Sequence, residues 1–268
     1  MDADDLTAYL ARIGVSRPSA PEIASLAAIH WGHVSTIPFE NLDILLGRRI
    51  ALDLPSLVAK LVHGGRGGYC FEQNALLAAV LEELGFGVTR LAGRVRWLAT
   101  GISPRTHMLL AVDVPGTPGR FLVDGGFGGT CPTAPIPLVD GAEVTQHHDR
   151  YRLIAEGHGH VVQVATGEGW SDMYWFTLEP QEAIDYEVAN HYTSTHPQSR
   201  FMLGLMCART TAEGRVTVRG NELVRRRGQG AAIVEREVIA DGEQLLEVLA
   251  RELGVRFPSG TRFRHGPA

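Results

Sequence analysis

The sequence is poor in cysteine. Its 268 residues contain three cysteines, Cys70, Cys131 and Cys207, which are widely spaced and form no CxxC pair. An odd number of scattered cysteines argues against a disulfide framework and against a zinc site, and it fits a reducing cytoplasm. We therefore expect a cytoplasmic protein that holds no structural metal.

Long apolar runs and an excess of basic residues are also missing. No apolar stretch reaches the roughly 18 residues that a membrane-spanning helix needs. The first residues, MDADDLTAYLARIG, begin acidic and lack a basic segment followed by an apolar one, so we expect no secretory signal. The net charge of −5 and the pI near 6.1 do not indicate a general polyanion binder. Neither a membrane nor a nucleic acid is expected as a partner.

Hydrophobic periodicity predicts helices in the first part of the chain. Apolar residues recur at helical spacing over residues 4–13, from about 19 to 33, over 54–63 and over 71–84. Gly14 and Gly85 follow two of these segments, as glycine does at helix C-termini. We expect residues 1–86 to form a mainly helical region.

The period then changes to that of strands. Short segments separated by Gly- and Pro-rich turns predict an antiparallel sheet or a small barrel within residues 87–194. The predicted strands cover residues 87–98, 106–114, 120–127, 136–139, 143–146, 150–155, 160–165 and 173–178. A short return of the helical period is expected over 181–194.

The last region, residues 195–268, mixes both patterns. A helix is predicted over 241–254, with Asp241 at its N-cap and Gly254 at its end. Strands are predicted over residues 201–209, 214–218, 221–224 and 231–238. The whole chain is therefore expected to be α+β.

One stretch stands out, the sequence GGRGGYCFEQN over residues 64–74. Glycines lead into Cys70, and the predicted helix begins at or just after this residue. Unpaired N–H groups and the positive end of the helix dipole favour a thiolate there. The glycines allow a sharp turn and leave space for a substrate. Cys70 is thus a candidate nucleophile, although a buried apolar thiol is the commoner fate of a free cysteine.

A thiol nucleophile needs a base, and the base needs a group that fixes its tautomer. His107 opens a predicted strand, and Asp124 ends another before the sequence GGFGG. The predicted register of the two strands does not bring His107 and Asp124 together. A five-residue hairpin loop places residue 110 opposite 124, which puts His107 and Asp124 on opposite faces of the sheet. A four-residue loop or a bulge would restore the parity. The strand pattern therefore leaves open whether Cys70, His107 and Asp124 lie together.

Other patterns are weaker candidates. The histidines at 147–148, 158 and 160 lack the spacing of a known metal site and are expected on exposed hairpins. GGFGG at 125–129 is not a Walker loop, yet it can bring bare N–H groups to a substrate. The triplet RRR at 225–227 is expected in a solvated turn, although three cations could also meet ligand phosphates. Cys131 and Cys207 are expected to be structural or incidental thiols.

Several blocks together resemble a known family. IPFENLDILL (37–46), RGGYCFEQNALL (66–77), RTHMLLAV (105–112), LVDGGFGG (122–129) and NHYTSTHPQSRF (190–201) are similar to the arylamine N-acetyltransferases of prokaryotic type. The resemblance implies a catalytic triad of Cys70, His107 and Asp124. It also implies a helical bundle, a central antiparallel β-barrel and a C-terminal α/β lid, around a core like that of the cysteine proteases.

The resemblance also assigns roles to other residues. Glu40 and Arg66 match the family's buried charged pair, which supports the active-site loop. The acceptor pocket is implied to be lined by Phe39, Val95, Phe127 and Phe201. The thioester and the pantetheine arm are implied to lie beside Thr106, Gly126 and Gly128.

The implied reaction is acetyl transfer from acetyl-coenzyme A to an arylamine or arylhydrazine, in two steps through acetyl-Cys70. Acetyl-coenzyme A is then a co-substrate, with no permanently bound cofactor, and a role in xenobiotic metabolism and a homodimer are further expectations. A cysteine hydrolase, a transglutaminase-like enzyme and an amide synthase would use the same triad. A binding module without catalysis would form no acetylated Cys70.

Overall fold

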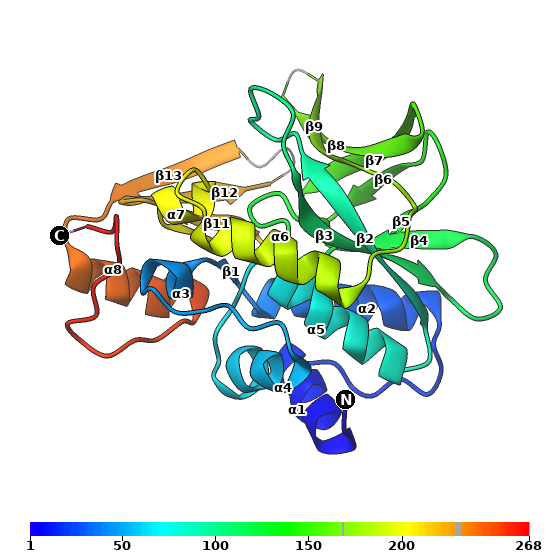
Figure 1. Cartoon of the computed structure of the whole chain (residues 1–268), viewed down its shortest axis with the longest axis horizontal. Coiled ribbons are helices and arrows are strands. Elements are labelled where there is room, and N and C mark those ends of the chain that lie inside the picture. The colour runs from blue at the N-terminus through cyan, green and yellow to red at the C-terminus, as the bar shows by residue number, and fades with distance from the viewer. Residues whose placement is uncertain (168, 229–231, 268) are drawn as a thin grey trace.

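The computed structural model describes residues 1–167, 169–228 and 232–267 as an α+β protein (Figure 1). Helices dominate its N-terminal part, as the periodicity predicts. They are α1 (Ala3–Ile13), α2 (Ile23–Thr36), α3 (Leu42–Leu45), α4 (Leu54–Leu57), the π-helical turn η1 (Val58–His63) and α5 (Cys70–Glu83).

The ends of these helices follow local rules. Asp2 caps α1 by accepting the N–H of Asp5, and Gly14 ends it with a φ of 68°. Leu6, Tyr9 and Leu10 of this helix are buried in the core. Asp53 caps α4 in the same way, by accepting the N–H of Ser56. The predicted helices over residues 4–13, 54–63 and 71–84 are confirmed.

The central sheet has eight antiparallel strands in the order β5-β4-β3-β2-β9-β8-β7-β6. Its edge strand β5 comes back to contact β7, so that the sheet is a nearly closed barrel. The strands are β2 (Gly87–Val95), β3 (Arg105–Asp113), β4 (Arg120–Val123), β5 (Ile136–Pro137), β6 (Glu143–Gln146), β7 (Asp149–Glu156), β8 (Gly159–Thr166) and β9 (Gly169–Phe176). Helix α5 packs against β2 and β3, and α6 (Ala183–Thr195) packs against β3.

A second antiparallel sheet lies beside the barrel, in the order β1-β10-β11-β12-β13 (Figure 1). It joins distant parts of the chain, because Phe39 of β1 pairs with Ala208 of β10. Its strands are β1 (Phe39–Glu40), β10 (Met206–Thr210), β11 (Gly214–Arg219), β12 (Glu222–Arg227) and β13 (Ala232–Val238). The segment α8 (Gly242–Val248) and η2 (Leu249–Leu253) contributes to the apolar core beneath it. Asp241 and Gly254 cap this segment as predicted.

The hairpin between β3 and β4 differs from the prediction. Asp113 pairs with Arg120, so the loop has the residues 114–119 and not a five-residue length. Strand β4 also ends at Val123 and not at residue 127, since the glycines after Asp124 leave the ladder. This register puts residue 124 level with Leu109, two residues from His107 and on the same face. The five-residue loop length was therefore wrong, and the observed register settles the question of faces that the sequence left open.

Two further predictions in the C-terminal region were wrong. The segment 201–209 is not one strand: α7 (Arg200–Leu203) precedes β10, and Ser199 caps that helix by accepting the N–H of Phe201. The RRR triplet is not a turn, because β12 extends to Arg227.

In the described ranges, no helix is long and apolar enough to cross a membrane.

Candidate active site

Cys70 is the first residue of α5 and is 3% exposed. Tyr69 precedes the helix in extended conformation, and its N–H is accepted by Oε2 of Glu72 at 3.1 Å. The glycines before it are needed for space. A Cβ added at Gly67 would lie 2.0 Å from the carbonyl oxygen of Pro38.

His107 and Asp124 form a buried pair. Nε2 of His107 lies 2.7 Å from Oδ2 of Asp124, and the two side chains are 3% and 0% exposed. Burial works against the imidazolium, but the charge of Asp124 and the hydrogen bonds to Asp124 and Cys70 outweigh it and raise the pKa of His107 to about 10. Since Nε2 is occupied, Nδ1 is the ring nitrogen left for the thiol of Cys70.

Asp124 is held by further donors. Its Oδ1 accepts from Nδ2 of Asn74 at 3.0 Å and from the N–H of Gly126 at 2.9 Å. Burial alone would raise the pKa of Asp124, but His107 and these donors hold it below its usual range. The carboxyl group is therefore ionised at neutral pH.

Asn74 joins the three predicted residues into one site. It lies one turn after Cys70 on α5, where residues four apart share a face. Its Nδ2 also donates to the carbonyl of Met108 at 2.7 Å, and its Oδ1 accepts the N–H of Gly125 at 2.8 Å. The nucleophile helix is thus tied to the strand of His107 and to the loop of Asp124. The i, i+4 spacing predicts that Asn74 shares a helix face with Cys70, but it does not predict the contacts of Asn74 with the barrel.

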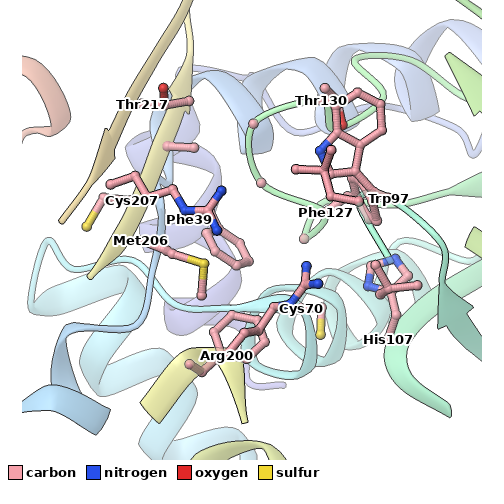
Figure 2. Close-up of a pocket in the computed structure, with 18 of the residues that line it drawn as sticks. Phe39, Cys70, Trp97, His107, Phe127, Thr130, Arg200, Met206, Cys207 and Thr217 are labelled. Carbon is pink, nitrogen blue, oxygen red and sulfur yellow. The ribbon is translucent and has the colours of Figure 1, made fainter. Parts of the chain in front are cut away.

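A cavity of about 570 Å³ opens between the barrel, α5 and the second sheet, and both Cys70 and His107 line it (Figure 2). The thiol also lies 3.6 Å from the carbonyl of Thr106. A Cβ added at Gly126 would lie 2.5 Å from Cα of Cys70, so only glycine allows this loop to approach so closely. Every residue predicted for the acceptor or coenzyme side lines the cavity: Phe39, Val95, Thr106, Gly126, Phe127, Gly128 and Phe201.

The cavity has walls that sequence reasoning missed. Trp97, Leu98 and Met206 add apolar surface. The aromatic ring of Phe127 packs edge-on to His107, with 5.2 Å between centroids. Apolar and aromatic walls that carry a small number of polar groups are typical of a small-molecule site.

Glu40 and Arg66 pair as predicted, within a larger buried cluster. Oε1 of Glu40 accepts from Nε and Nη2 of Arg66 at 2.9 and 2.6 Å, and its Oε2 accepts the N–H of Leu42. Lys60 extends the cluster to Glu72 at 2.6 Å and to Asp43 at 2.8 Å. Burial would lower the pKa of Lys60, but the three carboxylates raise it. The cluster fixes the loop that precedes Cys70.

Two buried histidines support the site from behind. Nε2 of His30 lies 2.9 Å from the carbonyl oxygen of Asp124. His33 lies between Tyr9 and Gln73, at 2.8 and 2.9 Å, and Gln73 donates to the carbonyl of Gly68. Burial lowers the pKa of His33 to about 3, so the ring is neutral.

The other histidine and cysteine candidates contact protein groups. His147 stacks on Trp31, and His148 lies 2.9 Å from the carbonyl oxygen of Thr211. Within the part of the chain that the structure describes, no group of three or more His, Cys, Asp or Glu side chains could hold a metal. Cys131 donates to the carbonyl of Asp124 at 3.0 Å, and Cys207 is buried beneath the second sheet.

Comparison with known proteins agrees with this geometry. A family model described as N-acetyltransferase matches residues 22–261. The chain is 43% identical over 257 residues to the arylamine N-acetyltransferase of Mycolicibacterium smegmatis, a match that covers 94% of this chain and 92% of the relative. The chain belongs to the arylamine N-acetyltransferase family.

Solved structures of this family share its fold. The arylamine N-acetyltransferase of M. tuberculosis superposes with a TM-score of 0.89 at 41% identity, and the match covers 93% of both chains. The Mycobacterium marinum enzyme, solved in complex with CoA, gives a TM-score of 0.88 at 37% identity over 93% of this chain and 92% of the other. The α+β fold expected from the resemblance, with a helical bundle, a barrel and an α/β lid, is thus confirmed by the solved structures of the family.

Proposed function

We propose that this protein transfers the acetyl group of acetyl-coenzyme A to an arylamine or arylhydrazine through an acetyl-Cys70 intermediate. One observation carries the proposal: the thiol of Cys70 and the ring of His107, itself paired with Asp124, line one cavity. The M. marinum relative solved in complex with CoA supports the choice of donor.

In the first step the thiolate of Cys70 attacks the thioester carbonyl. The bond from this carbonyl to the sulfur of coenzyme A breaks, and the leaving thiolate takes the proton held by His107. Asp124 keeps the imidazolium in place before this transfer. The products are acetyl-Cys70, free coenzyme A and a neutral His107.

In the second step the amine nitrogen attacks acetyl-Cys70. His107 takes the proton of the amine, and Cys70 leaves as a thiolate. Acetylation removes the charge and the hydrogen bond of Cys70 that help to raise the pKa of His107. The ring therefore holds its proton less tightly in the intermediate than in the free enzyme, and this order of events gives ping-pong kinetics.

The walls of the cavity support a flat aromatic acceptor. Phe39, Phe127 and Phe201 line it, and aromatic rings pack well against one another edge-on or offset. Arylamines are weakly basic, so they are neutral nucleophiles at pH 7. Xenobiotic arylamines fit this description.

The experiment is mass spectrometry of the protein after mixing with acetyl-coenzyme A alone. We expect a gain of one acetyl group on the peptide that contains Cys70, and its loss with release of acetylated product when an arylamine is added. The Cys70→Ala variant should gain nothing, while Cys131→Ala, a matched control at a second buried thiol, should still gain the acetyl group on Cys70. Turnover by Cys70→Ala, or release of acetate in place of an amide, would overturn the proposal.

A cytoplasmic location, a homodimer and the division of the chain at residues 86 and 194 stay predictions. The three free cysteines support the first of these.

A further inference from the structure

The RRR triplet splits between two environments because it lies on a strand, where neighbouring side chains point to opposite faces. Arg225 is bonded to Glu235 and Glu252 on the face away from the cavity. Arg226 lines the cavity and donates to Oγ1 of Thr217 at 3.1 Å. In the described ranges Arg226 has no carboxylate partner.

The surroundings of Arg226 are positively charged. Arg215 stands directly opposite it on β11, and like charges opposite each other on a sheet repel. Among the described residues that line the cavity there are four arginines and one aspartate, Asp149, whose carboxylate is already bonded to Arg215. The chain as a whole has a net charge of −5. The excess of positive charge is therefore local to the cavity.

A glycine-rich turn lies against the same wall. A Cβ added at Gly129 would be 3.2 Å from Cγ2 of Thr217, the residue that accepts the hydrogen bond of Arg226. The backbone N–H groups of Gly129 and Thr130 donate to no acceptor in the part of the chain described. Free backbone N–H groups beside a guanidinium are suited to the oxygens of a phosphate.

We propose that Arg226, with the N–H groups of Gly129 and Thr130, forms a subsite for a phosphate group of the coenzyme A of the acyl donor. This assignment rests on the function proposed above. Figure 2 separates Thr130 and Thr217 from Cys70, which lies at the other end of the cavity. The reactive thioester and the phosphates are likewise at opposite ends of acetyl-coenzyme A, with the pantetheine arm between them.

The test compares two donors, acetyl-coenzyme A and acetyl-pantetheine, which carries the same thioester without the coenzyme's phosphates. For Arg226→Ala we expect the ratio of kcat/KM for acetyl-coenzyme A to kcat/KM for acetyl-pantetheine to fall by about tenfold, since a lost hydrogen bond to a charged group has an effect of this order. The fall should come from KM for acetyl-coenzyme A and should shrink as salt is added. Arg226→Lys should recover part of the ratio.

Arg227→Ala is the matched control. It removes the same charge from the next residue of β12, which is exposed and does not line the cavity. The ratio of the two donors for Arg227→Ala should equal that of the wild type. An equal fall of the ratio in both variants would mean that only the net charge matters, and it would overturn the proposed subsite.

A second arm compares the acceptors 4-aminobenzoate and 4-methoxyaniline with acetyl-coenzyme A as donor. If Arg226→Ala changed the preference between these acceptors and left the donor ratio intact, the anion would be an acceptor carboxylate and the proposal would be wrong. If the wild type acetylated an amine from neither donor, the proposed function itself would fail.

Discussion

Two buried ionic clusters support the site of Cys70, and they differ in what they leave unbonded. In the cluster of Glu40, Asp43, Lys60, Arg66 and Glu72, cations and carboxylates pair with one another, and even Oε2 of Glu40 is used by the N–H of Leu42. In the pair of His107 and Asp124, Nε2 is bonded, and the ring lines the cavity beside Cys70.

The difference shows that a buried ion pair has no fixed role. Both clusters remove charges from water, which costs free energy unless partners compensate it. In the first cluster each carboxylate has a cationic partner, and its effect is to fix the glycine loop before Cys70. In the second, one titratable nitrogen is left facing the cavity, so that a proton can move there. Three predictions separate the two roles.

The largest effect is expected for Asp124→Asn. The carboxylate holds the His107 ring and its positive charge, so its loss should lower turnover on the order of 10³-fold or more, as for triads elsewhere. Steady-state acetylation of an arylamine measures this, and the rate of Cys70 alkylation by iodoacetamide at pH 7 should fall as well. An alkylation rate equal to that of the wild type would show that Asp124 has no role in activating Cys70.

The opposite outcome is expected for the fully paired cluster. Arg66→Met leaves the carboxylate of Glu40 buried without its partner, which should lower the free energy of unfolding by ~3–5 kcal/mol. Glu40→Gln together with Arg66→Met removes both charges and should regain much of this loss. Thermal and urea unfolding provide the measurement.

If the two clusters have different roles, the folded fraction of the Arg66→Met variant should keep most of the wild-type turnover per molecule. A loss of turnover as large as that of Asp124→Asn, in protein that unfolds like the wild type, would mean that the two clusters share one role.

The smallest effect concerns pH. Folding raises the pKa of His107 from 6.5 to about 10, so the pair with Asp124 contributes its full stability below about pH 6.5 and loses it as the pH rises through 10. The difference in melting temperature between the wild type and His107→Gln should be several degrees near pH 6 and should shrink towards pH 10. A difference that grows with pH would contradict the raised pKa of His107.

The matched substitution in the other cluster sharpens this test. Arg66 keeps its charge across this range because arginine is not deprotonated in proteins. Burial raises the pKa of Glu72 in the same cluster to about 7, so the comparison is made above that pH. Between pH 8 and pH 10 the effect of Arg66→Met on melting temperature should vary less than that of His107→Gln.

Short-range rules determined much of the fold. Helix α5 begins at Cys70 and ends before Gly85, and α1 is capped by Asp2 and Gly14, because caps and apolar spacing act within a few residues. The strands of the barrel were found in order by their alternation and turns. The family resemblance also identified part of the lining of the cavity, although it missed Trp97, Leu98 and Met206.

Register and long-range contacts were not determined in this way. A loop over 114–119, one residue longer than expected, moved residue 124 to the face of His107, since the side-chain period of a strand is two. The RRR triplet read as a turn because its composition is polar, yet pairing with β11 and β13 makes it a strand.

The partners of the site lie still further along the chain. Asn74 meets Asp124 across 50 residues, and His30 meets its carbonyl across 94. No local pattern encodes these contacts, because they depend on how α2, α5 and the barrel pack together. The sequence, through its motifs and the family resemblance, predicted the residues of the candidate site, whereas the tertiary structure decided which of them touch. Packing between distant segments is the physical reason for that difference.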